Sequence, residues 1–110
     1  MISKRTIVDK REIVQGGIIQ VRFRKEIVED GKVLAFEYHR TSLEPGTSLA
    51  NQMAAVNDHL EKMGHAPVDD DGVASIRRIM DVEHTPEAVE KFRLSRIAPI
   101  MAESAPEVIG

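Results

Sequence analysis

The 110-residue sequence predicts an α+β fold in which an N-terminal three-stranded antiparallel meander packs against two or three C-terminal helices. Three observations predict it. Asp30-Gly31 lies between two runs rich in β-branched and aromatic residues, which is the strongest short-range signal of a β-hairpin. Apolar residues recur every three or four positions between residues 49 and 63, as on one side of a helix. Thr85-Pro86-Glu87 is typical of a helix start.

Three strands are expected, over about residues 6–14, 18–28 and 33–41. The first turn is Gln15-Gly16-Gly17, and its two glycines permit several turn types or a bulge, so the register of the first strand stays open. The second turn is tighter, because an Asp-Gly loop supplies the positive φ values that a two-residue hairpin turn requires.

Pairing outward from this second turn sets Val28 opposite Val33, Ile27 opposite Leu34 and Phe23 opposite Tyr38. Side chains alternate across a strand, so nearly every large apolar group then lies on one face, which is expected to form the core. The same register sets Arg24 opposite Glu37 on the wet face. The expected core face carries Ile19, Val21, Phe23, Ile27, Leu34, Phe36 and Tyr38, and the expected wet face carries Gln20, Arg22, Arg24, Glu26, Ala35, Glu37 and His39.

Three helices are expected, over about residues 48–63, 72–81 and 86–97. Thr47 or Ser48 can cap the first, and Asp70 or Asp71 the second, because their side-chain oxygens accept backbone N–H groups. Residues 99–110 lack a clear period and are expected to form a tail beyond a single domain of residues 1–98. The apolar stripe of the first helix is expected to cover the sheet; it consists of Leu49, Met53, Val56, Leu60 and Met63.

Composition limits the possible functions. The sequence has no cysteine, so neither a disulfide framework nor a thiolate metal site is possible. Its net charge of −3 argues against a general attraction to nucleic acid or to an anionic membrane. The N-terminal residues lack the apolar region of a signal peptide, so none is expected. No apolar run has the length that a transmembrane helix needs.

No motif indicates catalysis. The four histidines lack the spacing of a helical metal site, and Asp69-Asp70-Asp71-Gly72 fails the calcium-loop pattern at both of its ends. Glycine-rich phosphate loops and nucleophile elbows are also missing. We therefore expect a protein that is not an enzyme, with no catalytic residue, no cofactor, no metal and no small-molecule substrate.

The basic residues of the second strand suggest an alternative. Arg22 and Arg24 share a face, so the chain could be a cytoplasmic nucleic-acid or regulatory binding module that uses this face. The acidic net charge of the chain favours a different interpretation, in which these arginines simply belong to a solvated strand face. Nucleic acid is therefore not the expected partner. The expected interaction surface includes Arg22, Arg24, Glu37, His39, Ile100 and Met101.

Several short strings occur together in an order that resembles a group of short, mostly uncharacterised proteins encoded among the structural genes of tailed bacteriophages and prophages. They are Glu29-Asp30-Gly31-Lys32, Tyr38-His39-Arg40, Pro45-Gly46 and Thr85-Pro86-Glu87-Ala88-Val89. The resemblance implies a non-enzymatic virion component, in the tail, baseplate or fibre-attachment region, assembled in the host cytoplasm. Its implied partners are other tail proteins and copies of itself.

Overall fold

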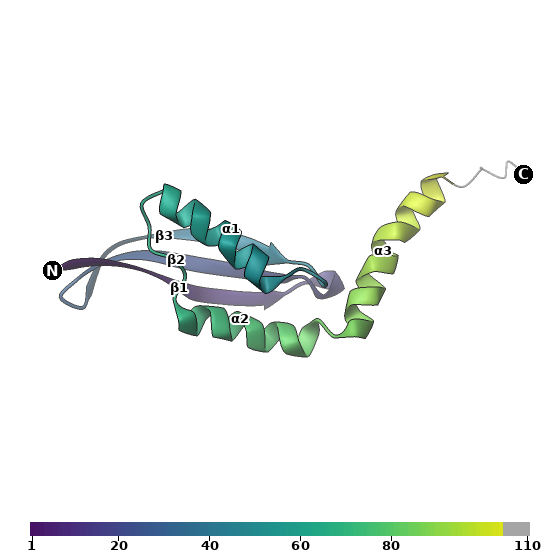
Figure 1. Cartoon of the computed structure of the whole chain (residues 1–110), viewed down its shortest axis with the longest axis horizontal. Helices are drawn as coiled ribbons and strands as arrows, with labels where there is room; N and C mark the ends of the chain where they lie inside the picture. The colour runs from purple at the N-terminus through teal and green to yellow at the C-terminus, as the bar shows by residue number, and fades with distance from the viewer. Residues whose placement is uncertain (105–110) are drawn as a thin grey trace, which may run out of the picture.

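The computed structural model describes the backbone of residues 1–104 and the side chains of residues 1–97. It confirms the α+β architecture: three strands come first and three helices follow (Figure 1). The elements are β1 (Ile2–Ile13), the short 3₁₀ helix η1 (Gln15–Gly17), β2 (Ile19–Glu29), β3 (Lys32–Leu43), α1 (Leu49–Lys62), α2 (Asp70–Glu83) and α3 (Pro86–Ser104).

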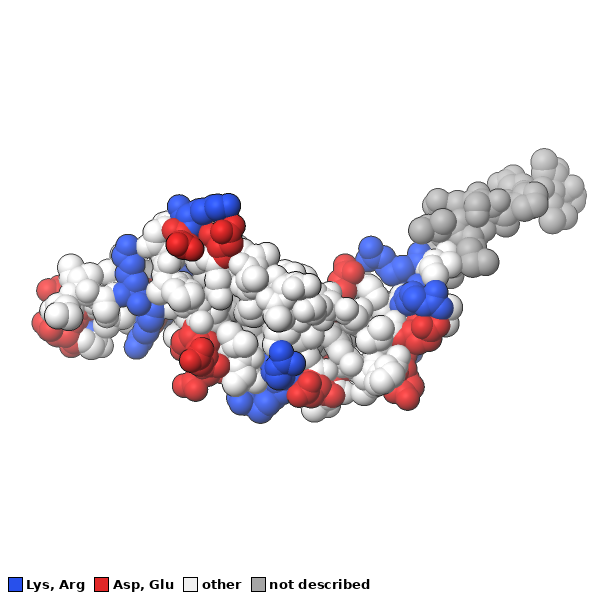
Figure 2. Space-filling view, viewed as in Figure 1, with Lys and Arg blue, Asp and Glu red and all other residues white. Residues whose placement is uncertain are grey.

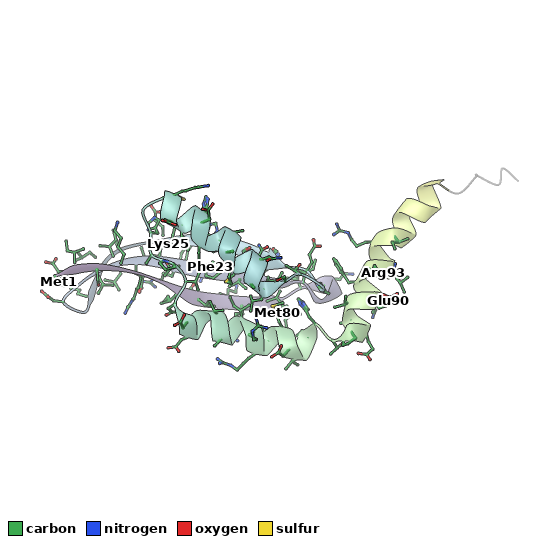
Figure 3. The ribbon with its side chains drawn as sticks, viewed as in Figure 1. Met1, Phe23, Lys25, Met80, Glu90 and Arg93 are labelled. Atoms are coloured by element: carbon green, nitrogen blue, oxygen red, sulfur yellow. The ribbon has the colours of Figure 1, made fainter. Side chains whose placement is uncertain are left out.

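The strands form one antiparallel sheet in the order β1-β2-β3, so β2 is central and the other two are edges. In Figure 1, α1 crosses in front of the sheet and α2 lies alongside β1, and both helices contribute buried residues to one core with β2. The core lies between them and β2, and Phe23 is near its middle (Figure 3). Its buried apolar residues are Ile19, Val21, Phe23, Leu43, Leu49, Met53, Val56, Leu60, Val68 and Ile76.

The apolar stripe predicted for the first helix is therefore confirmed for its first four members. Met63 differs, because it lies at the C-terminal cap of α1 and is half exposed. Ser48 caps the start of α1, and its Oγ accepts the N–H of Asn51 at 3.3 Å. The cap of α2 is Asp69, one residue before the predicted candidates, and its carboxylate accepts the N–H of Gly72 at 2.8 Å.

The predicted register of the β2–β3 hairpin is wrong beyond its first pair. Val28 does pair with Val33 across the Asp30-Gly31 turn, whose φ values of 50° and 80° are those of the expected tight loop. A bulge then inserts Leu34 as an extra residue, and Ile27 pairs with Ala35.

Because the side-chain period of a strand is two, this one-residue shift moves the rest of β3 to the opposite face. Phe23 lies opposite His39 rather than Tyr38. Phe36 and Tyr38 leave the core face and stay about half exposed, as does Leu34. The space that they would have filled is taken by α1, which packs over small and polar residues of β3; Gln52 Nε2 donates to Thr41 Oγ1 at 2.6 Å.

The first strand is longer than predicted, because it begins at Ile2 rather than near residue 6. A second bulge, at Asp9, interrupts its pairing with β2. The segment between α1 and α2 runs along its outer edge: the N–H of Asp69 donates to the carbonyl of Thr6 at 3.0 Å, and the hydroxyl of Thr6 donates to the carbonyl of Ala66 at 2.7 Å. This edge of the sheet is therefore partly covered.

Helix α3 leaves the body of the protein (Figure 1). It begins as predicted, with Thr85 Oγ1 accepting the N–H of Ala88, but it continues through Pro99 to Ser104 instead of ending near residue 97. Its first turns pack on η1, where a Cβ at Gly16 would lie 3.8 Å from Cδ2 of Phe92. In the same part of α3, a bidentate ion pair between Arg93 and Glu90 supports the exposed helix, with hydrogen bonds of 2.5 and 3.0 Å (Figure 3).

Gly72 permits the close contact between α2 and the sheet. A Cβ at this position would lie 2.6 Å from Asp69 Oδ1 and 2.8 Å from Val8 Cγ2. We predict that Gly72→Val lowers the free energy of unfolding by about 1–3 kcal/mol, because it displaces the helix cap and forces α2 off β1. Urea denaturation would measure this change. The matched control is Ala74→Val, which places the same side chain at an exposed position of the same helix, and an equal loss in both variants would contradict the explanation.

Candidate interaction surface

The side of the sheet opposite α1 and α2 carries no helix within the described chain, and we call it the open face. The register of the three strands defines its membership. It carries more cations than anions, although the whole chain is acidic. Its central residues are Arg5, Ile7, Asp9 and Lys10 from β1, Arg22, Arg24 and Glu26 from β2, and Phe36, Tyr38 and Arg40 from β3.

Two arginine–aromatic pairs occupy the middle of the open face. The guanidinium carbon of Arg22 lies 4.3 Å from the centre of the Tyr38 ring, and that of Arg24 lies 3.8 Å from the centre of the Phe36 ring. The two rings meet edge to face, with centres 5.5 Å apart. Such cation–π contacts contribute about 0.5–1 kcal/mol each at exposed sites. Both rings remain accessible, since Phe36 is 48% and Tyr38 is 42% exposed.

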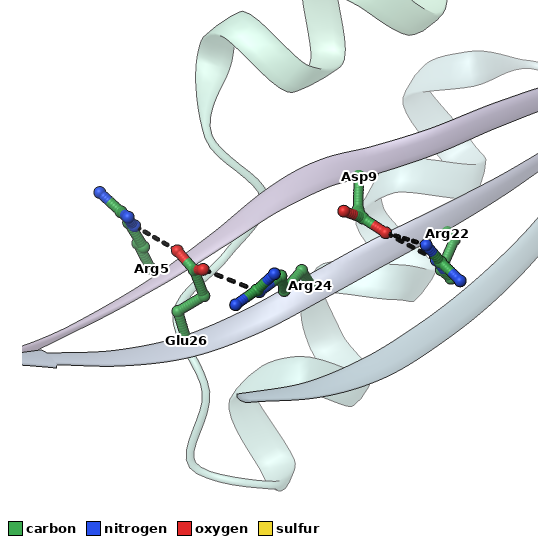
Figure 4. Close-up of polar contacts among 5 residues, drawn as sticks. All are labelled: Arg5, Asp9, Arg22, Arg24 and Glu26. Carbon is green, nitrogen blue, oxygen red and sulfur yellow. Dashed lines mark hydrogen bonds and ion pairs between the residues drawn. The ribbon is translucent and has the colours of Figure 1, made fainter. Parts of the chain in front are cut away.

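A buried carboxylate holds two of the arginines in place. Glu26 is only 4% exposed, and its two oxygens lie between Arg5 and Arg24 (Figure 4). Arg5 Nε donates to Oε1 at 2.5 Å, and Arg24 Nε lies 2.9 Å from Oε2 as an ion pair without hydrogen-bond alignment. Glu26 therefore compensates the charge of both guanidinium groups and keeps Arg24 over the Phe36 ring.

Asp9 has the same role for the third arginine. It lies at the bulge of β1, and Arg22 Nε donates to its Oδ2 at 2.7 Å (Figure 4). The bulge is what directs this carboxylate toward β2. Arg22 is thus held between an acid on one side and the Tyr38 ring on the other.

One end of the open face is hollowed and more strongly basic. The hollow has a volume of about 220 Å³, and the charged residues of its lining are three cations, Lys10, Arg22 and Arg40, and one acid, Glu12. Arg40 lies directly opposite Arg22 in the sheet. Among residues 1–97, Arg40 has no carboxylate within ion-pair distance. The guanidinium group of Arg40 is therefore open to a hydrogen-bond acceptor or an aromatic ring from another molecule.

Among the described residues, the charges on the opposite side of the molecule are distributed differently. Figure 2 shows the side that bears the helices, where acidic and basic side chains are mixed and no patch of one sign forms.

His39 and Glu37, predicted on the wet face with Arg22 and Arg24, lie instead on the side covered by α1. This correction follows from the bulge at Leu34. The His39 ring stacks on His59 of α1, with ring centres 4.9 Å apart. Glu37 lies opposite the buried Lys25, with 3.4 Å between Oε2 and Nζ, so the predicted Arg24–Glu37 pair does not form.

Burial and nearby cations lower the pKa of two histidines on this side of the sheet. The pKa of His39 is lowered, first by burial and then by His59 and Lys25. The pKa of His65 is also lowered, by burial and then by Lys25, against a smaller opposite effect of Glu37.

The structure brings together two of the residues predicted for the interaction surface, Arg22 and Arg24, and separates them from Glu37 and His39. Ile100 and Met101 belong to the backbone of α3, but their side chains lie outside the described residues. Sequence reasoning missed Phe36 and Tyr38 as surface residues. The alternation of β3 predicts that they share a face, but it does not say which one.

Among the described residues, no group of three or more His, Asp or Glu side chains is arranged to hold a metal ion. No described helix has the length and the apolar character needed to cross a membrane. Comparisons with models of known protein families, with curated proteins and with solved structures find no match to this chain.

Removing the charge of Glu26 should destabilise the protein. We predict that Glu26→Gln lowers the free energy of unfolding by about 1–3 kcal/mol, because two guanidinium groups lose the carboxylate that compensates them. Urea denaturation would measure the loss. Glu12→Gln is the control, since Glu12 is exposed and 3.9 Å from its Lys10 partner, and it should change the stability by less than about 0.5 kcal/mol. Equal stability of Glu26→Gln and the native chain would contradict the role given to Glu26.

The lowered pKa values of His39 and His65 predict that the protein loses stability in mild acid. Below the ordinary histidine pKa of 6.5, the unfolded chain binds protons that the folded chain does not. This contribution is complete above pH 6.5 and is lost as the pH falls through the folded-state values. Thermal unfolding between pH 7.5 and pH 5.5 would measure it. A His39→Gln/His65→Gln variant should show a smaller decrease, and an undiminished decrease would show that other groups are responsible.

Proposed function

We propose that the chain is a non-enzymatic assembly protein that binds protein partners through its open face. One observation carries the proposal: the sheet presents two half-exposed aromatic rings, and arginines flank them. Buried or partly buried acids hold these arginines in place. Tyr, Phe and Arg are the residue types enriched in protein–protein interfaces. A surface that is already ordered in the free protein also loses less side-chain entropy on binding.

The shape of the molecule supports the same proposal. Helix α3 projects from the body after its first turns, and Leu94 on it is half exposed. A projecting helix and an open sheet face allow one small chain to contact two neighbours at once. That arrangement is suited to a subunit that joins larger components.

Within this function, we propose a place in the virion of a tailed phage, in the tail, baseplate or fibre-attachment region. This step rests on the resemblance of the short sequence strings to phage structural proteins. Its implied partners are other tail proteins.

A nucleic-acid module is the second candidate, and a specific observation favours it: bases can stack on exposed aromatic rings of a sheet whose arginines contact phosphates. The charges argue against it. Glu26 and Asp9 already compensate three of the arginines on the open face, and Glu12 lies 3.9 Å from Lys10, which leaves Arg40 as the main group for phosphate. We therefore favour a protein partner.

Purified phage particles provide the test. We predict that mass spectrometry detects the chain in particles from a phage or prophage that encodes it. A Phe36→Ser/Tyr38→Ser variant should be lost from the particles, because its interface lacks both rings. Val82→Ser is the matched control, since Val82 is an exposed apolar residue on α2 and should be incorporated normally.

Absence of the native chain from particles would contradict the virion proposal. Tight, salt-sensitive binding of a single-stranded oligonucleotide, lost in Arg22→Ala/Arg24→Ala, would instead establish the second candidate.

A further inference from the structure

The two edges of the sheet differ. The outer edge of β1 is partly covered, because the segment between α1 and α2 bonds to Thr6 and because Arg11 Nη1 donates to the carbonyl of Ser75 at 3.0 Å. On the other side, β3 pairs with β2 alone. In the described part of the chain, no hydrogen bond from outside the sheet reaches the backbone of Lys32–Leu43.

This uncovered edge is unusually long. β3 has 12 residues, whereas natural edge strands are commonly short or carry protective features. Its single bulge lies at Leu34, near the turn, so the section from Ala35 to Leu43 pairs regularly. A regular edge of this length presents a row of unpaired N–H and C=O groups that another strand can bind.

The side chains of this section are complementary to themselves. If two copies pair antiparallel with Tyr38 opposite Tyr38, then Phe36 of each copy lies opposite Arg40 of the other. This contact supplies an aromatic partner that Arg40 lacks among residues 1–97, and it repeats the arginine–aromatic pairs already formed by Arg22 and Arg24. On the other face, the same register sets Glu37 opposite His39.

The register centred on Glu37 is less favourable. Centring the pair on Glu37 would place two carboxylates directly opposite each other, and like charges in that position are destabilising. It would also leave Arg40 opposite Leu34, at the bulge. The charges on β3 therefore disfavour the register centred on Glu37 and are compatible with the one centred on Tyr38.

We infer that two copies of this chain pair along β3, antiparallel and with Tyr38 at the two-fold axis, to form a continuous six-stranded sheet. Such pairing keeps the helices of both copies on one side and joins the two open faces on the other. The combined face then carries four aromatic rings in a row across the junction. This inference goes beyond the proposed function and does not depend on it: a monomeric chain would refute the pairing and leave the virion proposal standing.

Light scattering of the native chain across a range of concentrations tests the pairing. We predict a shift from the monomer mass to twice that mass as the concentration rises. Arg40→Glu should move this transition to higher concentration, because it removes the contact with Phe36 of the second copy. Arg78→Glu, on the exposed surface of α2, is the control and should leave the transition in place. A monomer at all concentrations would overturn the inference.

Disulfide trapping tests the register, because the native chain contains no cysteine. Tyr38→Cys should form a disulfide-linked dimer on mild oxidation. Phe36→Cys and Arg40→Cys should each stay monomeric alone, since identical positions would be separated by four residues, or about 13 Å. An equal mixture of the two should form the cross-linked dimer. Cross-linking of Phe36→Cys with itself, and not with Arg40→Cys, would overturn the proposed pairing.

Discussion

The bulge at Leu34 is the constraint on which the rest of the structure depends. It places one extra residue in β3, and every side chain from Ala35 onward takes the opposite face from the one that simple alternation out of the turn would assign. Leu43 enters the core as a result, opposite Ile19, and both are fully buried. The small and polar residues of β3 face α1, which can then pack close to the sheet.

The same bulge creates the candidate interaction surface. It moves Phe36 and Tyr38 to the side where Arg22 and Arg24 lie, and the four side chains form two cation–π pairs. Glu26 is buried on this side because it lies between two guanidinium groups. The open face is thus an ordered surface with partly compensated charge. These properties suit a protein partner better than the phosphate backbone of a nucleic acid.

Local signals predicted the parts of the fold that depend on local chemistry. The Asp30-Gly31 turn, the Ser48 cap and the Thr85-Pro86 helix start each depend on a few neighbouring residues, and each is present. The register could not be predicted in this way. It depends on how α1 packs over Thr41, which is a contact between distant segments, and a pattern read outward from the turn contains no information on it. Within the candidate site, the shared face of Arg22 and Arg24 could be predicted from the alternation of side chains along β2. Their aromatic partners could not, because these depend on the one-residue shift of β3 at its bulge.

The register of β2 against β3 is therefore the property to measure first. Cross-strand nuclear Overhauser effects between backbone protons report it directly in solution. The structure predicts contacts that pair Phe23 with His39 and Arg24 with Tyr38. Contacts that pair Phe23 with Tyr38 and Arg24 with Glu37 would show a hairpin without the bulge, with both aromatic rings in the core, and would contradict the account of the open face.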